Sequence, residues 1–221
     1  MSTGPSARRI SHAYREQRFL VLLVFLLLNI SVSVILEGSE RQLLRATVVS
    51  VVLLAAIGCL QFKRGGVVIS RTFGAVTILS GWLPIVFELP VLAFLGEGFR
   101  IVFFLLVTAA LIYQVARSSD VTSGVIIGAV DGYLLLGSVG AVACAIIERA
   151  SPGSFASAGA QLEQSEFLYF SFVTLATVGY GDVVPVAPVA RSLVILLAVS
   201  GQIYIAVLMA LLVGKYVGMK K

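Results

Sequence analysis

Hydrophobic residues fall into long runs along the chain, separated by short polar breaks. A helix needs about 20 mostly apolar residues to cross a bilayer, and the breaks leave six runs of roughly that length. The predicted spans are Phe19 to Leu36, Leu43 to Phe62, Phe73 to Leu95, Ile101 to Ala116, Val125 to Ile147 and Val189 to Val213. The pattern predicts an all-α membrane protein with six transmembrane helices.

Two of the predicted spans have features that need an explanation, the third and the first. Pro84, Glu88 and Pro90 interrupt the third span, so we expect a kinked helix there, followed by a short turn with glycines and Glu97. Residues 1–36 could instead be a secretory signal, but the apolar run is long for one and lacks a small-residue cleavage site. We therefore interpret the first span as a retained anchor.

The region between the fifth and sixth spans is too long and too polar for a simple hairpin turn. It contains Phe167 to Ala176, an apolar segment too short to cross a bilayer, followed by the sequence ThrValGlyTyrGlyAsp at 177–182. Irregular backbone at membrane depth is tolerated only where protein buries it or where it lines a water-filled path. We predict a re-entrant half-helix followed by a loop that lines such a path.

Composition agrees with a membrane protein and disfavours other classes. The chain is 59% hydrophobic and 12% charged. Its basic residues gather at the ends of apolar runs, so the net charge of +5 does not indicate a nucleic-acid surface. Cys59 and Cys144 lie in apolar runs, and His12 is the only histidine. These residues give no disulfide framework, metal cluster or catalytic triad, so we expect no enzyme and no cofactor.

The distribution of Lys and Arg predicts the orientation of the spans. Eleven of the sixteen basic residues fall on the side of the N-terminus and five on the other side. Basic residues concentrate in cytoplasmic loops. We therefore expect residues 1–18 and 218–221 to be cytoplasmic, in a multi-pass protein of the cell membrane. The short loops favour a bacterial inner membrane.

Glycines at every second position of the loop permit an unusual backbone. A chain that alternates right- and left-handed conformations can aim successive carbonyls the same way, and Gly179 and Gly181 flank Tyr180 in that spacing. Carbonyls of residues 177–180, with the Thr177 hydroxyl, could then replace the hydration shell of a cation. The alternative is a tight external turn between two helices.

The sequence ThrValGlyTyrGly at 177–181, followed by AspValValPro, resembles the selectivity filter of the potassium channels. The resemblance covers roughly residues 121–217 and includes TyrLeuLeuLeuGly at 133–137 and SerProGlySerPhe at 151–155. It implies that the permeant ion is K⁺ and that it is held at four residues, Thr177, Val178, Gly179 and Tyr180. It also implies that Gly181 completes the filter and that Asp182 lies at the outer mouth. Because one loop supplies one wall of a pore, the resemblance implies a homotetramer around a central axis.

The resemblance divides the chain into a four-helix transmembrane domain at 19–117 and a pore domain at 118–217. It also places Gly201 where the family often has a gate hinge, although glycine in a spanning helix is as often a packing contact. Many relatives brace the filter with two tryptophans, where this chain has Tyr169 and Phe170. We expect Tyr169 to reach Asp182 and Thr174 to support Tyr180, in a filter that inactivates readily.

The fourth span departs most from voltage-gated relatives. Residues 101–116 contain no arginine, and Arg100 and Arg117 only flank them. Voltage sensing needs several charges inside the membrane field. We therefore expect weak or absent voltage dependence, and the few residues after Lys215 suggest no cytosolic gating domain.

Two acidic residues lie inside predicted spans, where a charge is costly and often functional. Glu88 could form an interfacial ion pair with Arg100, and Asp131, in the inner half of the fifth span, could respond to pH or take part in gating. Two other functions stay open: a non-conducting subunit that modulates another channel and, less favoured, a membrane enzyme.

Overall fold

The computed structural model describes residues 5–35, 41–60, 64–87, 89–118, 122–157 and 162–218. These residues form mostly helices, together with two strands of three residues each. The elements are α1 (Pro5–Ile35), α2 (Arg41–Cys59), α3 (Arg64–Phe87), α4 (Pro90–Arg117), α5 (Ser123–Ala150), β1 (Phe155–Ser157), α6 (Gln164–Leu175), β2 (Val183–Pro185) and α7 (Pro188–Gly218).

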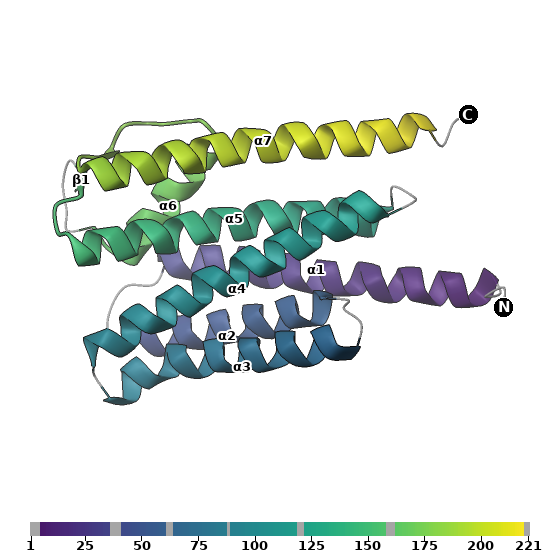
Figure 1. Cartoon of the computed structure of the whole chain (residues 1–221), viewed down its shortest axis with the longest axis horizontal. Helices are drawn as coiled ribbons and strands as arrows, with labels where there is room; N and C mark the ends of the chain where they lie inside the picture. Colours follow the sequence, from purple (N-terminus) through teal and green to yellow (C-terminus); the bar gives the residue numbers. More distant parts are fainter. Residues whose placement is uncertain are drawn as a thin grey trace.

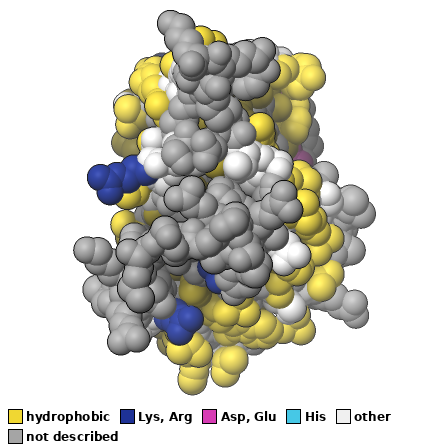
Figure 2. Space-filling view, turned by 90° about the vertical axis from the view of Figure 1, so that its right-hand side faces the viewer, with side chains coloured by type: hydrophobic (Ala, Val, Ile, Leu, Met, Phe, Trp, Pro, Cys, Tyr) yellow, Lys and Arg dark blue, Asp and Glu magenta, His cyan; other side chains and the backbone are white. Residues whose placement is uncertain are grey.

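The long helices run side by side as a bundle (Figure 1). Helices α1 to α4 form one side of it, α5 lies at the centre, and α7 lies on the far side of α5 with the short helix α6 between them. The start of α1 and the end of α7 lie at the same end of the bundle, and β1 lies at the opposite end. A few dark-blue basic side chains appear beside yellow hydrophobic ones at the end of the bundle that carries the termini (Figure 2).

Four helices contain apolar stretches long enough to cross a membrane: Ser70–Phe87, Val91–Arg117, Ser123–Ala150 and Pro188–Gly214. The apolar stretches of α1 and α2 are shorter, at Gln17–Ser33 and Leu43–Cys59. Of the six predicted spans, four are therefore confirmed as long enough among the described residues.

The boundary between the third and fourth spans was predicted at the wrong place. Helix α3 ends at Phe87 and α4 begins at Pro90, so Gly96 and Glu97 lie inside a helix and not in a turn. The reason is Pro90, which starts α4 because proline fits the first helical turn, while Leu89 before it is extended. Glu88 lies outside the described residues.

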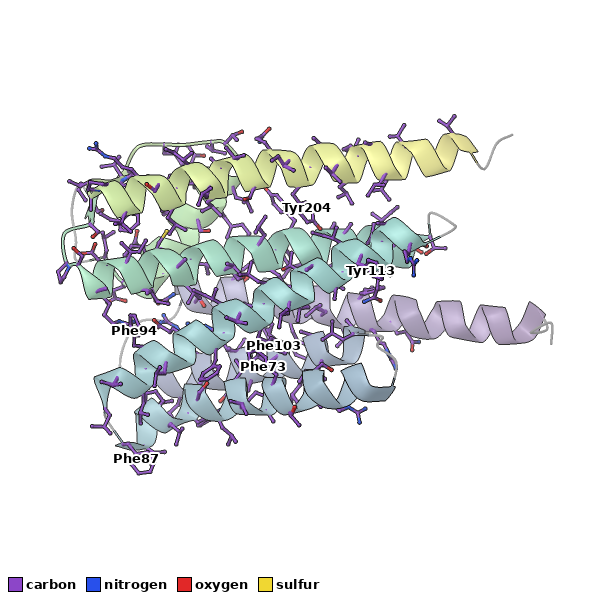
Figure 3. All side chains as sticks on the ribbon, viewed as in Figure 1. Phe73, Phe87, Phe94, Phe103, Tyr113 and Tyr204 are labelled. Atoms are coloured by element: carbon purple, nitrogen blue, oxygen red, sulfur yellow. The ribbon has the colours of Figure 1, made fainter. Side chains whose placement is uncertain are left out.

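The largest group of buried side chains joins α1, α2, α4 and α5. Leu22, Leu53, Phe103 and Leu135 are among its members, each with no more than 1% of its surface exposed. Phe103 also stacks on Phe73 of α3, with ring centroids 6.2 Å apart (Figure 3). Helix α5 therefore connects the four-helix side of the bundle to the segment that carries the loop at 176–182.

The two strands were not predicted. Strand β1 pairs antiparallel with β2, with Phe155 opposite Pro185 and Ser157 opposite Val183. The carboxylate of Glu148 accepts hydrogen bonds from the backbone N–H groups of Gly153 (2.7 Å) and Phe155 (2.9 Å), which fixes the turn before β1. This small sheet holds the chain that leaves the loop against the chain that enters from α5.

Candidate functional site

The loop after α6 alternates between two backbone conformations. Thr177, Gly179 and Gly181 have positive φ angles of 59°, 58° and 80°, whereas Val178 and Tyr180 between them do not. The sequence predicted this alternation for the glycines but not for Thr177. A side chain in the left-handed region costs about 1 to 2 kcal/mol, so the surrounding structure must hold Thr177 in place.

The hydrogen bonds of the loop run in one direction, toward the end of α6. The N–H groups of Val178 and Gly179 both donate to the Val173 carbonyl, at 2.9 and 3.4 Å, and Thr177 N–H donates to the Thr174 carbonyl at 3.0 Å. Among the described residues, none donates a hydrogen bond to the carbonyls of residues 177–180. Residues 176–182 are all exposed in the single chain. The loop therefore presents consecutive carbonyl oxygens that the described part of the chain leaves available to a ligand.

Tyr169 contacts Asp182 as the sequence predicted. The Tyr169 hydroxyl donates to Asp182 Oδ2 at 2.7 Å, and Asp182 Oδ1 accepts from Val183 N–H at 3.0 Å. The hydrogen bond from Tyr169 lowers the pKa of Asp182 and raises the pKa of Tyr169 to about 12. Asp182 is therefore an anion at neutral pH, tied to the helix that precedes the loop.

Thr174 and Phe170 support the loop in ways that differ from expectation. Thr174 contributes its backbone carbonyl, while the Tyr180 ring is 71% exposed and no described residue hydrogen-bonds its hydroxyl. Phe170 is buried and packs edge-on against Phe155 of β1, with centroids 5.6 Å apart. Phe170 therefore holds α6 by apolar packing against β1, which pairs with the strand β2 directly after the loop.

Helix α6 packs against small residues of α5, and the sequence analysis missed this contact. The Ser171 hydroxyl donates to the Gly137 carbonyl at 2.6 Å. A Cβ atom at Gly140 would clash with Ser171 Oγ and lie 2.7 Å from a methyl group of Leu197. The two closely spaced glycines of the fifth span at 137 and 140 were the pattern that could have indicated this contact.

Gly201 of α7 lies against the last residue of α6. A Cβ atom at Gly201 would lie only 2.6 Å from the carbonyl oxygen of Leu175. Helix α7 continues through this position without a break. The structure thus provides the packing contact that was one of the two explanations for this glycine.

The two acidic residues of the spans have different outcomes. Asp131 is fully buried in α5, and neither of its carboxylate oxygens has a hydrogen-bond partner among the described residues. Arg100 lies 3.7 Å from Glu97 on its own helix, and its predicted partner Glu88 lies outside the described residues. A gating role for either acid stays a prediction.

Comparison with known proteins finds similarity in the part of the chain that holds the loop. A family model described as "Ion channel" matches residues 132–217. The chain is also similar to the inward rectifier potassium channel Kirbac3.1 of Paramagnetospirillum magnetotacticum, with 38% identity over 71 residues, which cover 32% of this chain and 21% of the relative. The match thus spans about a fifth of that relative's length. No solved structure matches the chain.

Both similarities point to an ion channel and not to an enzyme. Together with the apolar helices, they indicate a multi-pass membrane protein. The matched residues contain the loop at 176–182 and the helices α6 and α7 that hold it.

Replacing Tyr169 by Phe removes the hydrogen bond to Asp182, so we expect the loop at 176–182 to be held less firmly and the ion current to inactivate faster. Because that bond lowers the pKa of Asp182, the stabilisation that the bond gives the loop is fully present at pH values above the ordinary carboxyl pKa. This stabilisation is lost as the external pH falls through the lowered pKa of Asp182. In Tyr169→Phe the pKa of Asp182 should be higher, so the current should change at a higher external pH than in the wild type. Recordings at a series of external pH values measure both changes. The matched control is Tyr113→Phe on α4, and inactivation unchanged in Tyr169→Phe would argue against the contact's role.

Proposed function

We propose that the chain is one subunit of a potassium-selective channel that conducts K⁺ passively. The observation that carries the proposal is the loop at 177–181, where positive φ angles alternate and the carbonyls of residues 177–180 have no donor among the described residues. Carbonyl oxygens of this kind replace the hydration shell of K⁺. The similarity of the chain to an inward rectifier potassium channel supports this ion.

The surroundings of the loop favour a cation. Helix α6 ends at Leu175, directly before the loop, and the carbonyl end of a helix carries a partial negative charge. Asp182 adds a full negative charge on the other side of the loop. In the proposed channel, Thr177, Val178, Gly179 and Tyr180 coordinate K⁺, and Asp182 concentrates cations at the outer mouth.

We infer a homotetramer because one loop gives only one wall of the pore. Of the apolar stretch of α7, 11% is buried within the chain, against 61% for α5. Exposed side chains cover much of α7, including Ile195, Leu196, Val199 and Ile203. Neighbouring subunits would bury this surface around the central pore.

We further propose that all six apolar helices cross the cell membrane and that both termini are cytoplasmic. The apolar stretches of α1 and α2 fall just short of a full span, and a neighbouring helix or flanking polar residues can accommodate such a mismatch. The shared end of α1 and α7 in Figure 1 agrees with the orientation that the basic residues predict.

Reversal potential in planar bilayers tests the proposed function. The purified full chain is reconstituted with K⁺ on one side and Na⁺ on the other, and the voltage is swept. We expect current to reverse near the K⁺ equilibrium potential. A reversal near zero would contradict selectivity, and the absence of current in a folded, tetrameric preparation would favour a modulatory subunit.

Voltage dependence should be weak. Between Arg100 and Arg117, α4 has no basic residue, and Arg117 stacks on Tyr113 at its end, with the guanidinium carbon 5.2 Å from the ring centroid. A charge that crosses the whole field contributes about 2.3 kcal/mol per 100 mV, and this stretch of α4 supplies none. Conductance should therefore change little with voltage and gating current should be absent. A channel with an arginine-rich sensor, recorded in the same bilayers, is the control; a steep conductance curve with gating current would contradict this prediction.

A further inference from the structure

A second feature of the molecule lies away from the loop. A cavity of about 740 Å³ opens between α2, α3, α4 and α5, with the segment that begins α6 along one wall. This volume is in the range of sites that bind small molecules. The lining includes Arg45, near the start of α2, and Arg149, at the end of α5. The cavity therefore lies at the end of the bundle opposite the termini.

Charged side chains converge in this cavity. The charged residues of its lining are Arg45, Arg100, Arg149, Glu97, Glu148 and Glu163. The acidic side chains already have partners: Glu97 pairs with Arg149 at 2.7 Å, and both oxygens of Glu148 accept backbone N–H groups. Arg100 is less well satisfied, since Glu97 is 3.7 Å away and its buried Nε has no hydrogen-bond partner among the described residues.

The remaining lining is amphipathic. Val49, Leu53, Ile78, Ile85 and Phe167 give apolar walls. Trp82 lies among them and donates its indole N–H to Ser50 Oγ at 3.0 Å. Tryptophan is typical of the level at which lipid headgroups meet the apolar bilayer. The exposed residues Gly81 and Arg149 show that the cavity reaches the surface.

We propose that this cavity binds the phosphate group of a membrane phospholipid, with Arg100 as the principal donor and the acyl chains along the apolar walls. A guanidinium group presents paired N–H donors that match phosphate oxygens, and a partly satisfied arginine gains most from such a ligand. Apolar walls beside the arginine distinguish a lipid from free inorganic phosphate. The site is separate from the proposed pore and does not depend on conduction.

Fluorescence of Trp82 tests the proposal, because it is the only tryptophan in the chain. The full chain, freed of lipid in detergent, is titrated with phosphatidylglycerol that carries bromine on its acyl chains, which quenches a tryptophan on contact. We expect quenching that saturates. Arg100→Gln should raise the half-saturating concentration at least about tenfold, as expected for about 1.4 kcal/mol of lost affinity.

Charge-neutral variants keep the test decisive if Arg100→Gln fails to fold. Ala93 is half-buried in the lining, and Ala93→Phe would fill the cavity without changing its charge, so it should abolish saturation. The matched controls on the same helix are Arg117→Gln and Ala109→Phe, both at exposed positions outside the lining, and they should behave like the wild type.

Two further probes identify the ligand group. Brominated diacylglycerol, which lacks phosphate, should quench weakly, and millimolar inorganic phosphate should leave the lipid bound. Equal quenching by diacylglycerol, or identical curves for the wild type, Arg100→Gln and Ala93→Phe, would overturn the proposal. Complete displacement by inorganic phosphate would overturn the assignment to a lipid. Because none of these readouts is a current, a failure here is distinct from a failure of the channel proposal.

Discussion

In the proposed channel, Gly179→Ala should abolish potassium selectivity. Gly179 has a φ angle of 58°, and nothing lies within 4 Å of the position a Cβ would take, so the effect comes from backbone strain and not from a clash. Alanine in this conformation costs about 1 to 2 kcal/mol, and in a tetramer the cost recurs in every subunit around the same ion path. The loop should relax toward negative φ and turn its carbonyls away from the pore.

The measurement is the reversal potential under a K⁺ and Na⁺ gradient. A selective channel shifts its reversal by about 59 mV for each tenfold change in K⁺, and Gly179→Ala should bring that shift close to zero or remove the current. Gly153→Ala is the matched control, because Gly153 also has a positive φ, 85°, and open space around it but lies in the turn before β1. A Gly179→Ala channel that keeps full K⁺ selectivity would refute the filter assignment.

Gly201→Ala should destabilise the packing of α7 against α6, which is the second large effect we expect. The added methyl group would lie 2.6 Å from the carbonyl oxygen of Leu175, and that oxygen belongs to the backbone and cannot swing aside like a flexible side chain. Overpacking of this kind typically costs about 1 to 3 kcal/mol. Because Leu175 directly precedes the loop at 176–182, the displacement would also disturb that loop.

Thermal unfolding of the purified protein measures this effect and separates the two explanations for Gly201. A packing contact predicts a lower melting temperature together with reduced current. A hinge predicts altered opening with an unchanged melting temperature. Gly214→Ala on the same helix is the control, since nothing lies within 4 Å of its Cβ position. An unchanged melting temperature in Gly201→Ala would therefore remove the packing explanation.

Local features of the fold and of the loop were predictable from the sequence for physical reasons. Apolar runs of spanning length identify helices because a bilayer leaves backbone groups no other partner. Glycines two residues apart predict left-handed backbone because only glycine adopts it without strain. The contact between Tyr169 and Asp182 was also accessible, through the resemblance to relatives that brace the same loop from the preceding half-helix.

Helix limits near residues 87–100 were not predictable in the same way. Glycine and glutamate at 96 and 97 resemble a turn, yet they lie inside α4. A Cβ at Gly96 would lie 2.6 Å from the Ser80 carbonyl oxygen, so this glycine permits the close approach of α3 to α4. The role of Gly96 depends on its contact with the neighbouring helix α3, which the local sequence does not identify.

The sequence by itself determined the class of protein, most of the helices and the loop with its alternating glycines, because each depends on residues adjacent in the chain. Only the tertiary structure decided how that loop is held. Phe155 packs on Phe170, Ser171 bonds to Gly137, and Gly201 contacts Leu175. The same is true of the cavity around Arg100, which residues from separate helices enclose. These contacts depend on how helices pack in three dimensions, and hydrophobic periodicity says which residues are apolar but not which of them meet.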